Sequence, residues 1–75
     1  MNTVPIAEIK AELKTMYPGY RYDMKAIPAT YSYSLTVFKG QDNISTLIFK
    51  AETPMTSFWE QVKDWMRPII RVYGA

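Results

Sequence analysis

Residues 30–52 have the sequence TYSYSLTVFKGQDNISTLIFKAE, and this stretch decides the fold that the chain predicts. Across residues 31–39, apolar side chains alternate with small polar ones, which is the period of a β-strand with one buried face. Residues 40–43 are turn-favouring or polar, and residues 44–51 return to β-branched and aromatic types. The stretch therefore predicts a β-hairpin of two antiparallel strands.

The two faces of this hairpin differ in character. In its first strand, one face carries only apolar side chains and the other is mostly hydroxylic. Its second strand has aliphatic side chains on both faces, so we expect part of the outer face to be apolar. The predicted inner face holds Tyr31, Tyr33, Leu35, Val37, Leu47, Phe49 and Ala51, and the predicted outer face holds Ser32, Ser34, Thr36, Phe38, Ile44 and Ile48.

Another strand is predicted before the hairpin, at residues 20–25. Tyr20, Tyr22 and Met24 alternate there with charged side chains, so they are expected on the buried face. The preceding Tyr-Pro-Gly at residues 17–19 ends a helix, because proline disfavours helical geometry at the residue before it.

That helix is predicted to be amphipathic. Thr3 is its expected N-cap, with Pro5 in the first turn, where a missing N–H costs nothing. At about 100° per residue the apolar side chains fall within one quadrant, which predicts a stripe that faces the core. The stripe is Ile6, Ile9, Leu13 and Met16, flanked by Lys10 and Lys14 on one side and by Glu8 and Glu12 on the other, as solvated flanks.

A second helix is predicted after the hairpin. Ser57 and Glu60 have the spacing of a capping box. The apolar side chains occupy one continuous arc of about 160°, and this segregation stays in phase through Pro68. We therefore expect one kinked helix from about Ser57 to Val72, with a break at Arg67 as the alternative. The arc consists of Phe58, Trp59, Val62, Trp65, Met66, Ile69, Ile70, Val72 and Tyr73.

These elements together predict an α+β fold in the order helix-β-β-β-helix. Each strand has one apolar face and each helix one apolar stripe. A three-stranded antiparallel sheet with both helices on one face buries all of them. A chain of 75 residues has room for one core, so residues 1–75 are expected to form a single compact mini-domain.

The composition excludes several chemistries. The chain has no cysteine and no histidine, so Ser-His and Cys-His nucleophilic pairs, thiol redox chemistry and the common zinc sites are impossible within one chain. It contains no G-x-x-x-x-G-K-[ST] or G-x-G-x-x-G motif, and three scattered glycines cannot form a phosphate-cradling loop. We therefore expect a protein that is not an enzyme and that uses no cofactor and no metal.

Charge and hydropathy indicate the cellular compartment in which the protein acts. The net charge is +2, with both signs interspersed along the chain. The sequence shows no signal-peptide core and no run of about 18 apolar residues that a membrane span needs. Together with the missing cysteines, this predicts a cytoplasmic protein that does not act in a membrane.

The order of elements and the length resemble those of double-stranded RNA-binding domains. That family contacts phosphates through a Gly-Pro-x-His loop between its first two strands and a Lys-Lys-x-Ala-Lys run at the start of its second helix. Here the loop reads Ala-Ile-Pro-Ala at residues 26–29, and the helix opens Met-Thr-Ser-Phe-Trp-Glu at residues 55–60. An acid in the first turn suits the helix dipole and repels a phosphate. The resemblance therefore implies the fold and does not carry the RNA-binding function.

A weak nucleic-acid-binding domain is the alternative functional interpretation. Tyrosines on an open sheet stack bases, but the tyrosines of this chain fall on the predicted inner face, where we expect them under the helices. The basic residues that would contact a nucleic acid are Lys10, Lys14, Arg21, Lys25 and Lys39.

Association with another protein explains more of the sequence. The apolar arc of the second helix is wider than the stripe of about 100° that a surface helix needs, so residues at its margins are expected to be partly exposed. Exposed aromatic, Met and Arg side chains are typical interface anchors. The sequence thus predicts a non-catalytic protein-binding module, an inhibitor or adaptor, whose partner is another protein or a second copy in a homodimer. The expected contact residues are Trp59, Met66, Arg67, Ile70 and Arg71 on the helix, with Phe38 and Ile48 on the outer sheet face.

Overall fold

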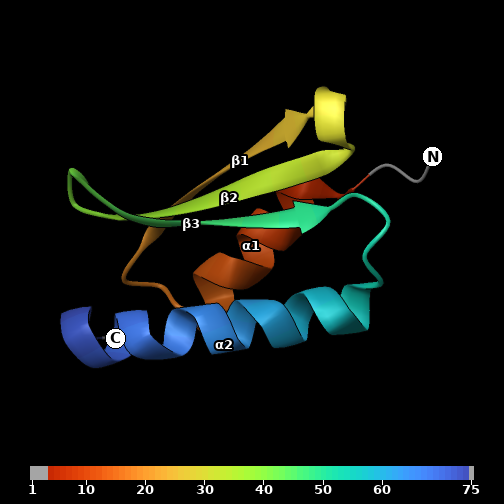
Figure 1. The fold of residues 1–75 in the computed structure, drawn as a ribbon. Coiled ribbons are helices and arrows are strands. Elements are labelled where there is room, and N and C mark those ends of the chain that lie inside the picture. Colours follow the sequence, from red (N-terminus) through yellow and green to blue (C-terminus); the bar gives the residue numbers. More distant parts are fainter. Residues whose placement is uncertain (1–3, 75) are drawn as a thin grey trace.

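The structure is a computed structural model that describes residues 4–74. It confirms the predicted α+β fold, a helix followed by three antiparallel strands and a second helix (Figure 1). The elements are α1 (Ile6–Met16), β1 (Arg21–Ile27), the 3-10 turn η1 (Pro28–Thr30), β2 (Ser32–Lys39), β3 (Asp42–Lys50) and α2 (Met55–Tyr73).

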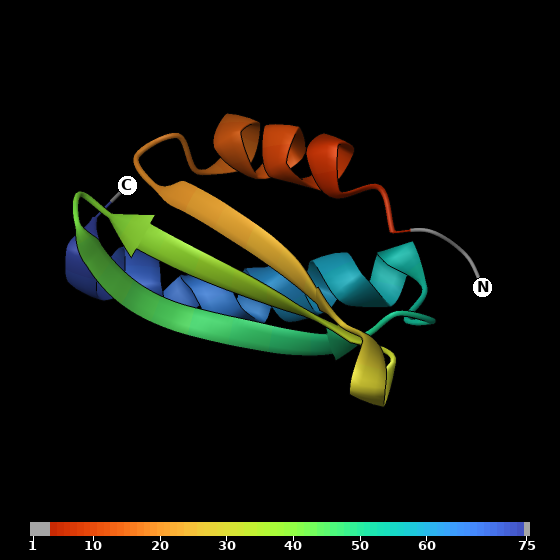
Figure 2. The ribbon, with the colours of Figure 1, turned by 90° about the horizontal axis from the view of Figure 1, so that it is seen from above.

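The strands form one sheet in the order β1-β2-β3, so β2 is central and β1 and β3 are the edges. Both helices lie on the same side of this sheet, α1 along β1 and α2 below β3 (Figure 1). Seen from above in Figure 2, no helix among the described residues covers the opposite face. The sheet therefore has one inner face, against the helices, and one open outer face.

The core lies between the inner sheet face and the helices. The alternation in the strands works as expected, because side chains two residues apart point to the same face. In α2, the residues one turn apart on its inner side are also buried. The buried apolar residues are Val4, Ile9, Leu13, Tyr20, Tyr22, Met24, Tyr33, Leu35, Val37, Phe49, Phe58, Val62, Met66 and Ile69.

A β-bulge in β3 corrects the prediction for Ile44. Phe38 pairs with Asn43, but Val37 pairs with Ser45, so Ile44 is an extra residue in the ladder. Because a strand alternates with period two, one extra residue turns the side chain to the other face. Ile44 is therefore packed against the core, and its assignment to the outer face is wrong.

Tyr31 is the second correction. It was expected in the inner row of β2, yet its side chain is 64% exposed. Its backbone has φ 54°, a left-handed conformation, because the turn η1 ends there and its N–H bonds to the carbonyl of Pro28. The strand begins only at Ser32, so Tyr31 lies outside the alternation that its neighbours follow.

The helix starts differ from the predicted caps. Pro54 precedes the first residue of α2, and no side chain caps this terminus, so the capping box of Ser57 and Glu60 is wrong. In α1, Pro5 occupies the capping position instead of the first turn. The other predicted cap, Thr3, lies outside the described residues.

Helix α2 continues through Pro68, as predicted, and the alternative of a break at Arg67 is wrong. Pro68 is exposed, so the backbone carbonyl that loses its donor lies on the side that water reaches. The helix then ends at Gly74, whose N–H bonds to the carbonyl of Ile70 at 2.8 Å. The full arc of apolar side chains is therefore carried by one helix.

Candidate interaction surfaces

The residues predicted to form a contact surface on α2 differ in their burial. Met66 is fully buried, so its assignment to a contact surface is wrong. It lies one turn from both Val62 and Ile69, and this row forms the centre of the buried side of the helix. The width of the apolar arc alone does not show which residues lie at the centre of the buried side.

The other predicted residues of α2 lie at or near the surface. Trp59 and Ile70 are half-buried and pack against the core with their inner sides. Arg67 and Arg71 are exposed, and Arg67 forms an ion pair with Asp64 at 3.0 Å. Trp59 also lines a pocket, together with residues of α1.

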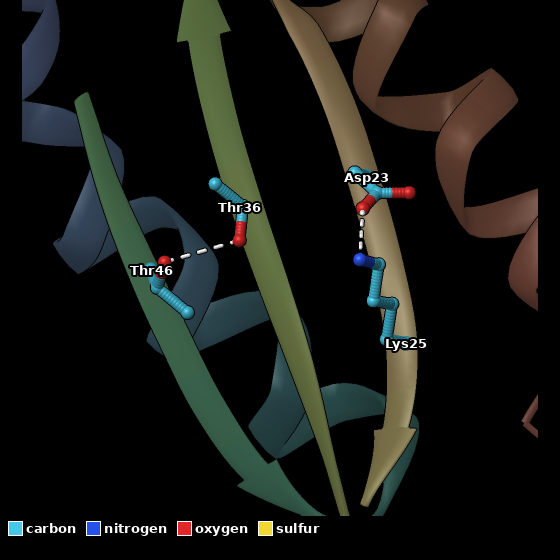
Figure 3. Close-up of polar contacts among 4 residues, drawn as sticks. All are labelled: Asp23, Lys25, Thr36 and Thr46. Atoms are coloured by element: carbon cyan, nitrogen blue, oxygen red, sulfur yellow. Dashed lines mark hydrogen bonds and ion pairs between the residues drawn. The ribbon is translucent and has the colours of Figure 1, made fainter. Parts of the chain in front are cut away.

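The outer sheet face is mostly polar. Figure 3 shows its middle, where the hydroxyls of Thr36 and Thr46 are 3.0 Å apart and Lys25 lies 3.7 Å from Asp23. Of the two predicted contact residues here, Ile48 is 62% exposed. The other, Phe38, is half-buried.

Phe38 is covered from the side by a cation. The guanidinium carbon of Arg21 lies 4.9 Å from the centre of the Phe38 ring. The same side chain donates a hydrogen bond to the carbonyl of Gly40 at 3.1 Å. Arg21 thus shields Phe38 from solvent, and Ile48 is the more accessible apolar side chain of the two.

The basic residues of the nucleic-acid alternative are distributed over different parts of the fold. Lys10 and Lys14 are on α1, whereas Arg21 and Lys25 are on the open outer face and are separated by Asp23. Lys39 lies at the β2–β3 turn, where its ammonium donates to the carbonyl of Tyr73 at 2.9 Å. Three of the five cations nevertheless meet at one end of the sheet, because the ammonium of Lys14 donates to the carbonyl of Tyr20 at 2.9 Å and that of Lys39 lies 4.8 Å from the Tyr20 ring, beside Arg21. Each of the three is engaged by a backbone carbonyl.

The tyrosines are occupied in the core. Tyr20, Tyr22 and Tyr33 are buried under the helices, as expected. The hydroxyl of Tyr22 donates to the carbonyl of Tyr17 at 2.8 Å, and that of Tyr20 donates to the carbonyl of Gly74. Burial raises the pKa of Tyr22 and of Tyr20 above the ordinary value of a phenol, so both hydroxyls stay protonated and serve as donors.

A groove that the sequence did not reveal runs between α1 and α2. We call it the helix groove. Its volume is about 670 Å³, and its walls are residues at helical spacing from both helices. It is lined by Pro5, Glu8, Ile9, Glu12, Met16, Met55, Trp59 and Lys63.

The floor of the helix groove is apolar. Ile9 is buried, Met16 and Trp59 are half-buried, and Met55 is 40% exposed. The indole of Trp59 is held edge-on against the ring of Phe58, with 5.0 Å between the ring centres. The lining of the groove therefore combines an aromatic ring that is held in place with two flexible methionine side chains.

The rims of the helix groove are charged. Glu8 and Glu12 lie on the α1 side and Lys63 on the α2 side. The ion pairs within residues 4–74 are Lys25–Asp23 and Arg67–Asp64, so none of the three rim charges has an ionic partner there. The helix groove thus combines an apolar floor with charged rims that have no ionic partner within residues 4–74.

Comparison with known proteins adds no relative. No protein-family model, curated protein or solved structure matches the chain. Within residues 4–74, no helix has the length and apolar character needed to cross a lipid bilayer.

Proposed function

We propose that this protein is a non-catalytic protein-binding module, and that the helix groove is its contact site. The observation that carries this proposal is the pairing of an apolar floor at Trp59 and Met55 with charges at Glu8, Glu12 and Lys63 that have no ionic partner within residues 4–74. Met55 is 40% exposed one turn before the half-buried Trp59, so apolar surface of both side chains contacts water. A partner side chain inserted there would remove both from water.

Affinity capture from the native host tests this proposal. The baits are the wild-type chain, Trp59→Ala, Met55→Gln and, as a matched control, Tyr31→Ala, which removes an exposed aromatic ring that does not line the groove. A partner retained by wild type and Tyr31→Ala, and lost from both groove variants, supports the proposal. Met55→Gln keeps the size and helical preference of the side chain, so its result stands even if Trp59→Ala does not fold. Equal capture by all four baits would contradict the proposal.

Self-association through β3 is a second candidate, favoured by the state of that edge. The N–H of Ala51 bonds to the carbonyl of Tyr31 at 2.7 Å, on the β2 side. Because antiparallel strands alternate, the backbone groups of Thr46 and Ile48 point the other way, toward the free edge, whereas the carbonyl of Lys50 accepts from the N–H of Thr53 at 3.0 Å. An edge strand with free donors and an exposed Ile48 is suited to pair with the same strand of a second copy.

The nucleic-acid alternative predicts binding that falls steeply as salt rises, because counterions are released. The hydrogen bonds of Lys14, Arg21 and Lys39 to backbone carbonyls favour the opposite result, because these cations already have partners within the fold. We expect no binding of labelled DNA or RNA oligonucleotides at low salt by fluorescence anisotropy.

A further inference from the structure

The helix groove carries a charge pattern that selects among partners. Glu8 and Glu12 are one turn apart on α1, so their carboxylates project from the same side of the helix. Lys63 is the only cation among the lining residues, and it lies on the opposite wall. The groove thus presents more negative than positive charge, and its acidic wall has no ionic partner within residues 4–74.

The shape of the groove selects a secondary structure. Its α2 wall is formed by Met55, Trp59 and Lys63, each one turn after the last, over a length of about 12 Å. Both walls are therefore helix surfaces, and side chains line them. A peptide that binds by adding a strand needs backbone partners from a free strand edge, which the lining residues on the two helices do not supply, whereas a helix satisfies its own backbone and docks by side chains.

The methionines of the floor favour the same kind of partner. Met16 and Met55 line the groove together with Trp59, and their unbranched thioether chains adapt to apolar residues of different shapes. An amphipathic helix presents such residues three and four positions apart, the spacing that fits between two helices.

We infer that the occupant of the helix groove is an amphipathic helix that carries lysine or arginine on its polar side. This inference rests on the proposed function. The apolar side of the occupant contacts Trp59 and the methionines, and its cations, one turn apart, pair with Glu8 and Glu12. Electrostatic complementarity of this kind sets which partners are accepted.

Nuclear magnetic resonance titration of the ¹⁵N-labelled chain tests the inference. The probes are two synthetic 14-residue amphipathic peptides, one of leucine and lysine and one of leucine and glutamate in the same pattern. We expect the lysine peptide to shift the indole signal of Trp59 and the amide signals of Glu8 and Glu12. We expect the glutamate peptide to bind about tenfold more weakly or not at all.

Charge-reversal variants separate the acidic wall from the net charge of the chain. Glu12→Lys should weaken binding of the lysine peptide by about tenfold, while Glu60→Lys, an equal change at an exposed position outside the groove, should weaken it by less than about twofold. Thermal melting confirms that both variants fold.

The remaining outcomes distinguish an error about the occupant of the groove from an error about the groove as a binding site. If both peptides shift the groove signals equally, or Glu12→Lys has no effect, the groove is a binding site and the inference about its occupant is overturned. If groove signals shift with protein concentration alone, the occupant is a second copy and the inference is also overturned. If neither peptide shifts these signals, the inference fails, and the capture experiment decides separately whether the proposed function survives.

Discussion

The indole nitrogen of Trp65 donates a hydrogen bond to the hydroxyl oxygen of Ser45, 3.0 Å away, and this bond ties α2 to the edge strand β3. Contacts of this kind show how the apolar arc of α2, which spans about 160°, is buried in a small domain. Trp65 extends the buried side of α2 toward β3, while Trp59 extends it toward α1 and forms the floor of the helix groove.

Removal of this bond should lower the stability of the fold. We expect Ser45→Ala to reduce the free energy of unfolding by about 1 kcal/mol, because the half-buried indole N–H loses its acceptor. Urea denaturation measures the change. Ser34→Ala, a half-buried serine of the outer face, is the control and should change stability by less than about 0.5 kcal/mol. Equal losses in the two variants would show that the bond to Trp65 contributes nothing specific.

Replacement of Tyr31 by glycine should stabilise the protein. Tyr31 adopts φ 54°, a conformation that costs a non-glycine residue about 1 kcal/mol, and its exposed ring returns little by burial. Tyr31→Gly relieves this strain, partly offset by the greater flexibility of the unfolded chain, and should gain about 0.5 kcal/mol. Tyr31→Ala keeps the strain and should gain nothing. A loss of stability in Tyr31→Gly would mean that the ring is needed for the turn.

Stability should depend on pH in the alkaline range. Burial raises the pKa of Tyr22 above 10.0, the ordinary value that applies in the unfolded chain. The unfolded state therefore loses this proton first, and the contribution to stability is complete below about pH 10 and falls as pH rises further. Denaturation at pH 8 and at pH 11 should show a smaller fall for Tyr22→Phe than for wild type. Tyr31→Phe, at an exposed position, is the control, and an unchanged fall in Tyr22→Phe would contradict the prediction.

Self-association, if β3 carries it, should depend on the edge and not on the outer face. We expect sedimentation of the wild-type chain to show a fraction of dimer that rises with protein concentration. Ile48→Lys should abolish the dimer, because charge on an edge strand opposes pairing. Ser34→Lys places the same charge on the outer face of the central strand and should leave the dimer intact. Loss of the dimer in both variants would assign the contact to the face, and a monomer at all concentrations would remove this candidate.

The fold was accessible from the sequence because its signals are local. Alternation in β1, β2 and β3 and the continuous apolar arc of α2 each follow from side chains close in the chain. The phase of the arc was enough to predict that α2 passes through Pro68. Tyr31 and Ile44 were misplaced because a turn residue with positive φ and a β-bulge each break the alternation at a single position.

The candidate site was much less accessible. Met66 was placed at a margin because the width of an arc does not reveal which residue faces the centre of the core. Glu8 and Glu12 were interpreted as a solvated flank, and Trp59 as a margin residue of a different helix. Only the packing of α1 beside α2 brings these three side chains to one groove.

Site-specific photo-crosslinking in the native host tests whether the helix groove contacts another protein. A benzophenone amino acid is placed at position 55 in the helix groove, at position 48 on the sheet edge or at position 31 on the exposed turn. We expect a discrete crosslink from position 55 to another protein and no such crosslink from position 31. Adding Glu12→Lys should abolish the crosslink from position 55. No crosslink from position 55, or the same crosslinked species from all three positions, would contradict the claim that the helix groove is where this protein binds its partner.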